Sequence, residues 1–472
     1  MERAVRAAAD DAGAPALLRQ LESIAVPQGM WEYRNPGRLL ADALGCPSAT
    51  SILSDLGVLQ LTLVSDLCRA ITEGRQHVGV ITGGEARFRE LRAAITGRPI
   101  TSTEQGESTP PPDVRLTSSD PWATDLESRA GLAAPVELFS IIESALRHAD
   151  GLDVDRHRDR VARLYGGFSE IAARNPHAWR REAVSPDAIR DPAPRNAMLA
   201  FPYTKRHASQ WNVNQAVAIL VCSAARATEL GLPRDRWIFP VAAAQSKHVV
   251  PLAQQGCLYS HPGTVRCGER ALALAGATIA DVGPAELYSC FPAAIQSFAR
   301  DLGLDASRPW TVTGSMAFAG GPYNSASLEG VGRMVEVLRD GGPERRLGLV
   351  ANLSGIFAKQ ACAIFSNVPG PDGYRFEDVT TEVAARDVPR PLNGDWVGPA
   401  TVVGCTVVFA GGVPSHAIAV CDTPAGERTV VRSEDPAVLE RMMQEELVGR
   451  VVEVDGAGFA LRSSSSTRTA SS

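Results

Sequence analysis

A phenol and a thiol lie two residues apart in the run 288–292, which reads Tyr-Ser-Cys-Phe-Pro. A strand is expected at 285–288 and a helix at 292–302, so the run occupies a strand-to-helix turn. Such groups can transfer protons beside a carbonyl group, and a thiol at a helix N-terminus is expected to have a lowered pKa. Tyr288 and Cys290 are therefore candidate catalytic residues. The alternatives are a packed aromatic ring and a small buried apolar side chain.

A second run, 313–322, reads Thr-Gly-Ser-Met-Ala-Phe-Ala-Gly-Gly-Pro. Its last three residues, Gly320, Gly321 and Pro322, are expected to form a tight turn, either close to a ligand or purely structural. Tyr323 and Asn324 follow directly and could face the same cavity. The second run therefore adds binding candidates to the catalytic ones.

The elements that would position these residues alternate along the chain. Helices are expected at 2–11, 35–44, 57–74, 264–275, 292–302 and 325–339, and strands at 22–27, 50–53, 77–84, 237–241, 285–288, 310–313 and 347–352. Such alternation predicts an α/β fold with mostly parallel sheets. Residues 98–135 include a proline-rich loop, and 136–200 are predicted to be largely helical.

The sequence pattern changes after residue 366, where the alternation of strands and helices stops. Short β-rich runs at 401–408, 416–421, 429–432 and 448–454 surround one expected helix at 436–446. This pattern favours a separate small β domain, similar to an OB-like barrel. The tail, 463–472, is of low complexity and is expected to be disordered.

Composition excludes several classes of function. The 472 residues are 44% hydrophobic and 21% charged, with a net charge of −6, so no basic patch indicates nucleic acid. Nine cysteines without paired spacing are typical of a reduced, cytoplasmic protein, and no cluster indicates a metal. No run is long and apolar enough to cross a membrane. Neither a dinucleotide fingerprint nor a phosphate-binding loop is present.

Several of these runs resemble active-site loops of the thiolase superfamily, and the closer resemblance is to type-1 thiolase-like proteins, which include sterol-carrier-type relatives and carry an added C-terminal β domain. The resemblance rests on the runs 175–179, 200–205, 213–216, 288–292 and 313–322. It implies two thiolase-type α/β halves, a helical loop insertion and a C-terminal β-rich, OB-like domain. The implied ranges are 1–97, 98–212, 213–366 and 367–462, followed by the tail at 463–472. The first half starts at its helix, so its first strand is expected to be missing, which would leave backbone groups of that sheet unpaired.

The resemblance also implies which chemical groups are lost. Thiolases need a nucleophilic cysteine, a second cysteine as base, and a histidine in an oxyanion hole. At the matching positions this chain has Gly57, Asn352 and Gly321. Ordinary thiolysis is therefore not expected, although Gly57 and Asn352 stay candidate binding positions.

The ligand implied by the resemblance is coenzyme A or an acyl-CoA thioester, with no covalently bound cofactor. Tyr203 and Lys205 could contact its phosphate or pantetheine, and Ser289 and Phe291 lie in the candidate loop. Three functions stay open. The chain could be a degenerate acetyl-CoA acetyltransferase-like protein, a retro-aldol lyase acting on a β-hydroxyacyl-CoA with Tyr288 or Cys290 as the proton-transfer group, or a non-catalytic acyl-CoA or lipid-binding protein. A homodimer or an OB-fold partner of lipid metabolism is also expected.

Overall fold

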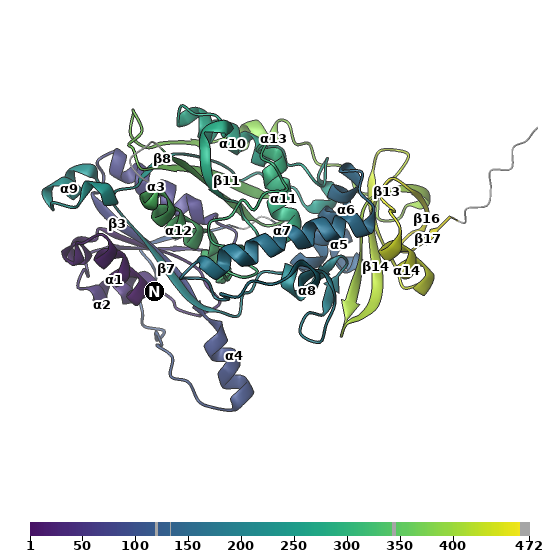
Figure 1. Cartoon of the computed structure of the whole chain (residues 1–472), viewed down its shortest axis with the longest axis horizontal. Coiled ribbons are helices and arrows are strands. Elements are labelled where there is room, and N and C mark those ends of the chain that lie inside the picture. Colours follow the sequence, from purple (N-terminus) through teal and green to yellow (C-terminus); the bar gives the residue numbers. More distant parts are fainter. Residues whose placement is uncertain (119–120, 133, 342–345, 463–472) are drawn as a thin grey trace, which may run out of the picture.

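The computed structural model describes residues 1–118, 121–132, 134–341 and 346–462. Two α/β sheets form one end of an elongated molecule and a β-rich part forms the other (Figure 1). The helices are α1 (Glu2–Asp11), α2 (Pro36–Leu44), α3 (Gln60–Thr72), α4 (Arg87–Thr96), α5 (Asp125–Ala130), α6 (Pro135–Ala149), α7 (Val154–Arg174), α8 (Pro186–Arg190), α9 (Ala224–Glu229), α10 (Pro262–Leu274), α11 (Pro292–Asp301), α12 (Ala326–Asp340), α13 (Thr380–Ala384) and α14 (Pro436–Gln444). The predicted tail lies outside the described residues.

The first sheet has the strand order β4-β2-β1-β3-β7. Its strands are β1 (Ser23–Pro27), β2 (Thr50–Ser54), β3 (Val78–Ala86), β4 (Val114–Leu116) and β7 (Asn214–Cys222). β1 pairs in parallel with β2 on one side and with β3 on the other. The expectation that a missing first strand leaves backbone groups unpaired is therefore wrong, because the interior strands pair directly with each other.

The second sheet has the order β12-β8-β11-β10-β9. Its strands are β8 (Phe239–Ser246), β9 (Val282–Glu286), β10 (Leu347–Ser354), β11 (Lys359–Ser366) and β12 (Arg375–Asp378). The strand predicted at 310–313 is absent from it. The reason is Glu286, whose carboxylate accepts hydrogen bonds from the backbone N–H groups of Val312 (2.6 Å) and Thr313 (3.0 Å). Those donors are therefore not available to a strand ladder.

Helices cover both faces of the two sheets and fill the space between them. Val5 of α1 and Leu40 of α2 pack with Ile24 and Val26 on the outer face of the first sheet. The intervening residue, Ala25, faces the other way and packs with α3 and α12 between the sheets. Helix α10 packs on β8, β11 and β12 of the second sheet, and α6, α7 and α11 contribute to the same hydrophobic cluster. The result is a layered α/β body, which confirms the predicted fold class.

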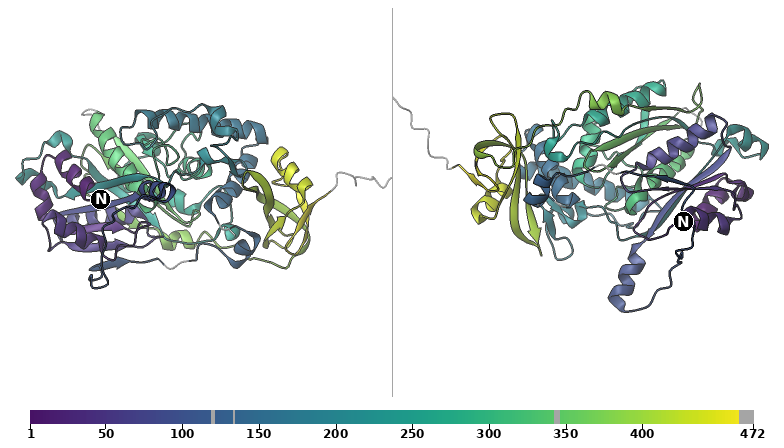
Figure 2. Two further views of the ribbon diagram at one scale, coloured as in Figure 1. Left: turned by 90° about the horizontal axis from the view of Figure 1, so that it is seen from below. Right: turned by 180° about the vertical axis from the view of Figure 1, so that it is seen from behind.

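The third sheet lies at the far end (Figure 2). Its strands are β13 (Val397–Ala410), β14 (Val413–Asp422), β15 (Arg428–Ser433), β16 (Val451–Asp455) and β17 (Phe459–Leu461), joined by β5 (Met198–Ala200) and β6 (Tyr203–Thr204). The strands do not follow the predicted domain ranges. β4 and β5 come from 98–212 but belong to the first and third sheets, and β12 lies beyond 366 but belongs to the second.

Candidate functional site

A cavity of about 400 Å³ opens where loops from both halves meet. Gly57 reaches it from the turn before α3, and Tyr288 from the loop after β9. Tyr323 and Asn324 reach it from the 3-10 turn η6 (Tyr323–Ser325), which precedes α12. These are four of the residues singled out from the sequence. The other residues lining the cavity are Leu56, Gln60, Ser118, Trp122, Val249, Leu353, Ser354, Gly355, Ala358 and Lys359.

Gly57 has no room for a side chain. Its φ is +91°, in the left-handed region that favours glycine. A Cβ atom built there would lie 2.8 Å from Ser118 Oγ and 3.0 Å from Ser118 Cβ. The backbone conformation and the neighbouring Ser118 therefore both oppose a side chain, such as that of cysteine, at position 57.

Lys359 and Ser118 occupy the space beside Gly57. Lys359 Nζ donates a hydrogen bond to Ser118 Oγ at 2.6 Å and one to the Gly57 carbonyl oxygen at 3.3 Å. The lysine is 7% exposed, at the start of β11. The same three residues also line a neighbouring cavity of about 640 Å³, where Arg69, Arg115 and Lys247 contribute positive charge and Asp66 and Asp378 negative charge. Sequence reasoning found neither Ser118 nor Lys359.

Asn352 takes part in a chain of amide hydrogen bonds. Its Oδ1 accepts from the backbone N–H of Leu61 at 3.1 Å, so its Nδ2 must point toward Gln60, where it donates to Oε1 at 2.8 Å. Gln60 Nε2 in turn donates to Asn324 Oδ1 at 2.7 Å. Each step fixes the orientation of the next amide.

Asn324 ends this chain with an unused donor. Its side chain is 7% exposed, and its Nδ2 has no hydrogen-bond partner among the described residues. A buried N–H group without a partner is unusual and invites a ligand acceptor. The side chain therefore offers the cavity wall an N–H group ready for an oxygen atom.

The two tyrosines of the cavity are proton donors rather than bases. Burial raises the pKa of Tyr288 above its ordinary value, and the nearby Cys290 adds to the effect. Burial also raises the pKa of Tyr323, with a contribution from Glu85. Tyr323 is 41% exposed and has a φ of +50°, which is rare for a residue with a side chain. Both phenols are thus neutral and can donate hydrogen bonds near pH 7.

Cys290 lies outside this cavity, packed against the hydrophobic core. Burial raises the pKa of its thiol, outweighing hydrogen bonds from the N–H groups of Phe291 and of Cys290 itself, which act in the opposite direction. The prediction that the start of α11 lowers this pKa is therefore wrong. The free-energy cost of removing a thiolate from water is larger than the stabilisation that the helix N-terminus provides.

Several other candidates have structural contacts instead. Tyr203 is fully buried; its hydroxyl donates to Glu143 Oε2 and accepts from the N–H of Ala293. Phe291 stacks on the rings of Phe139 and Tyr203. Ser289 Oγ accepts a hydrogen bond from the N–H of Met316 at 3.2 Å. Lys205 is exposed in the turn that follows β6.

The glycine-rich turn is shaped by close packing. A Cβ atom at Gly320, whose φ is +110°, would lie 1.9 Å from Gln215 Oε1. One at Gly321 would lie 2.1 Å from Ser209 Oγ. Gly321 and the buried Pro322 are not part of the 400 Å³ cavity wall. Position 321 therefore has no space for a larger side chain such as histidine.

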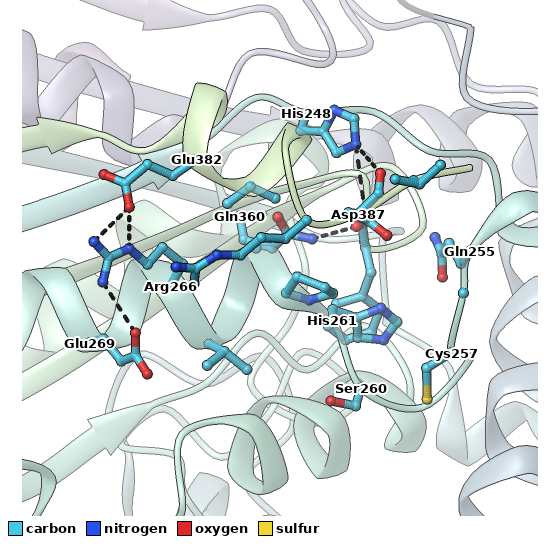
Figure 3. Close-up of a pocket in the computed structure, with 18 of the residues that line it drawn as sticks. His248, Gln255, Cys257, Ser260, His261, Arg266, Glu269, Gln360, Glu382 and Asp387 are labelled. Carbon is cyan, nitrogen blue, oxygen red and sulfur yellow. Dashed lines mark hydrogen bonds and ion pairs between the residues drawn. The ribbon is translucent and has the colours of Figure 1, made fainter. Parts of the chain in front are cut away.

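A further cavity, of about 520 Å³, is lined by Gln360, which follows Lys359 in β11 and therefore lies on the opposite face of that strand. Figure 3 shows Gln360 in this cavity with His261 and Arg266. His261, at the N-terminus of α10, is 3% exposed and stacks on Phe357 at 3.7 Å. Burial lowers its pKa to about 3. Arg266 binds Glu382 and Glu269 at the other end of this cavity.

Among the described residues, no group of three or more histidine, cysteine, aspartate or glutamate side chains is arranged to hold a metal ion. Within the same ranges, no helix is long and apolar enough to cross a membrane. The polar side-chain groups of the 400 Å³ cavity wall are phenol, amide, hydroxyl, indole and amine groups.

Comparisons with known proteins give solved structures but no sequence relatives. No family model matches the chain, and no curated protein is similar in sequence. The structure of a monomeric SCP2-thiolase-like protein type 1 from Mycobacterium smegmatis is similar over 98% of this chain and 94% of its own, with a TM-score of 0.79 and 22% identity.

Two more distant structures share the fold. The Ltp2-ChsH2(DUF35) aldolase is 17% identical, with a TM-score of 0.54, and covers 76% of this chain and 90% of its own. The Acat5 thiolase from Ascaris suum in complex with coenzyme A is 15% identical, with a TM-score of 0.52, and covers 78% and 92%. The chain thus has the fold of the thiolase superfamily, and over nearly its whole length that fold is the one seen in a type-1 thiolase-like protein.

Proposed function

We propose that this protein binds an acyl-CoA thioester in the 400 Å³ cavity and does not perform thiolysis through position 57. The observation that carries the proposal is the meeting of Gly57, Tyr288, Tyr323 and Asn324 in one cavity wall. The volume is in the range of small-molecule sites. A thiolase of the same fold has been solved with coenzyme A, which supports the choice of ligand.

The donors of the cavity suit a thioester carbonyl. Two neutral phenols and the unused Asn324 N–H group can each donate to an oxygen atom. Trp122, which is 47% exposed, provides an apolar wall for an acyl or pantetheine chain. The adjoining cavity with Arg69, Arg115 and Lys247 offers positive charge for phosphate groups.

Calorimetric titration of the full chain with acetyl-CoA tests this proposal. We expect saturable binding, weakened about tenfold or more in Trp122→Ala. Trp211→Ala is the matched control, because Trp211 is 44% exposed but lines none of the cavities described above. Acetoacetyl-CoA and free coenzyme A should give no thiolysis. Absence of binding in the wild type would refute the proposal, and ordinary thiolysis would refute the assignment of position 57.

A second candidate function is retro-aldol cleavage of a β-hydroxyacyl-CoA. Two tyrosines line the cavity, and an aldolase shares the fold. Such cleavage needs a base for the β-hydroxyl group, whereas the raised pKa of Tyr288 and Tyr323 makes both phenols poor bases. Thioester binding is therefore favoured. Cleavage of such a substrate that is lost in Tyr288→Phe would reverse that preference.

A further inference from the structure

Ser118 lies where the missing nucleophile would have been. The Cβ atom that a residue at position 57 would carry falls 2.8 Å from Ser118 Oγ. The serine hydroxyl thus fills space that a side chain at position 57 would need. It is brought there by the chain that follows β4, on the edge of the first sheet, and it is partly exposed.

Lys359 is the partner that could activate this hydroxyl. The 2.6 Å contact between Lys359 Nζ and Ser118 Oγ joins residues 241 positions apart, so the fold as a whole creates it. The amine also donates a hydrogen bond to the carbonyl oxygen of Gly57, which helps to anchor it. A serine hydroxyl within hydrogen-bond distance of an amine is the arrangement used by serine–lysine nucleophiles.

Asn324 supplies the third group that acyl transfer requires. Its Nδ2 is a buried donor without a partner among the described residues, and its orientation is fixed through Gln60 and Asn352. Ser118, Lys359 and Asn324 all line the same 400 Å³ cavity. A nucleophile, a proton acceptor and a donor for the carbonyl oxygen are therefore present in one wall.

We infer that the protein hydrolyses thioesters through Ser118, with Lys359 as general base and Asn324 as donor to the carbonyl oxygen. This inference rests on the proposed binding of a thioester in the cavity. It assigns to a serine from the predicted insertion the role of acyl acceptor that Gly57 cannot fill.

The reaction has two steps. In the first, Ser118 Oγ forms a bond to the carbonyl carbon while the Lys359 amine takes the hydroxyl proton. The carbon–sulfur bond then breaks, and the leaving thiolate receives that proton from Lys359, giving free thiol and an acyl-serine. In the second, Lys359 takes a proton from water, whose oxygen attacks the acyl carbon. The ester bond breaks, the proton returns to Ser118, and a carboxylic acid leaves.

The test follows release of free thiol from acetyl-CoA by the full chain, together with peptide mass spectrometry for acetylated Ser118. We expect Ser118→Ala to lower the rate at least about 100-fold, and Lys359→Met to lower it by a similar factor. Ser128→Ala is the matched control, since Ser128 is an exposed serine of the same predicted insertion that lines none of the cavities described above, and should keep the wild-type rate. Ser118→Cys should still become acetylated at position 118. That result would show that Ser118→Ala loses thiol release because it lacks a nucleophile and not because it is misfolded.

Calorimetry on the same variants separates the two ideas. Ser118→Ala should bind acetyl-CoA within about threefold of the wild type, because only the reacting oxygen is removed. Binding without thiol release in the wild type would overturn the serine mechanism and leave the proposed function standing. An unchanged rate in Ser118→Ala, or an acyl group found on another residue, would also overturn it. No binding at all would remove both.

Discussion

Placing a side chain at position 57 should destabilise the protein for two separable reasons. The first is the φ of +91°, since a left-handed conformation costs an L-residue roughly 1–2 kcal/mol relative to glycine. The second is contact with Ser118, whose Oγ and Cβ lie 2.8 and 3.0 Å from the new Cβ atom. Overpacking of this kind costs about 1–3 kcal/mol. Gly57→Ala should therefore lower the free energy of unfolding by about 2–5 kcal/mol, the sum of the two costs.

Gly74 provides a matched control for the first reason. Its φ is +70°, and a Cβ atom built there meets nothing within 4 Å. Gly74→Ala should therefore show the conformational cost alone, about 1–2 kcal/mol. The difference between the two alanine variants measures the contact with Ser118. Adding Ser118→Gly to Gly57→Ala should recover that difference and leave the conformational cost, in a double-mutant cycle.

Unfolding in urea, monitored by circular dichroism and extrapolated to water, gives the free energies. The chemical counterpart is Gly57→Cys, which places a thiol at the position that the resemblance matches to the thiolase nucleophile. We expect it to be at least as destabilised as Gly57→Ala and to give no thiolysis of acetoacetyl-CoA. A Gly57→Cys variant with wild-type stability, or with an acylated thiol at position 57, would refute the reasoning, because it would mean that the loop can accept a side chain.

Other contacts give predictions on a smaller scale. The Cys290 thiol, whose pKa burial raises, should stay unmodified by iodoacetamide at pH 8 in the folded chain and react once urea unfolds it; rapid labelling of the folded form would contradict this. Burial raises the pKa of Asp301 to about 7, so stability should fall as pH rises from about 4 to 7, by up to roughly 1.4 kcal/mol per pH unit, and Asp301→Asn should flatten that part of a urea-unfolding profile. Arg428, 2% exposed, binds Asp422 at 2.8 Å and the carbonyl oxygen of Gln255, so Arg428→Met should cost about 3 kcal/mol by the same assay. On the same strand, Arg432→Met should cost less than about 1 kcal/mol, because its partner Glu434 is largely exposed, and equal losses in the two would be evidence against the buried contact.

Helices and strands whose hydrophobic residues recur at a regular spacing, and whose ends are marked by typical residues, could be predicted from the sequence. The helix expected at 2–11 is α1, whose buried Val5 and Ala9 lie one turn apart. The strand at 310–313 could not be ruled out in advance, because its replacement depends on the Glu286 carboxylate. β11 was missed because it begins with Lys359 and Gln360, polar residues that the fold buries on opposite faces.

The candidate site was predictable only in part. Resemblance to a known family brought Gly57, Tyr288, Tyr323 and Asn324 together, and the structure places them in one cavity. Ser118 and Lys359 carried no local signal, since their contact joins distant parts of the chain. The pKa of Cys290 was predicted in the wrong direction because helix position can be read from sequence, whereas depth of burial cannot.

The pairing of β5 with β13 ties the time course of synthesis to the assembly of the third sheet. Ala200 is opposite Val408, and the N–H of Phe201 donates to the Val407 carbonyl oxygen at 2.8 Å. Ser144 of α6 accepts a hydrogen bond from the N–H of Cys405. During synthesis, β5 and α6 therefore leave the ribosome long before β13, with which they form hydrogen bonds. A nascent chain stopped near residue 390 would expose these unpaired groups, which could then bind a holdase or neighbouring nascent chains.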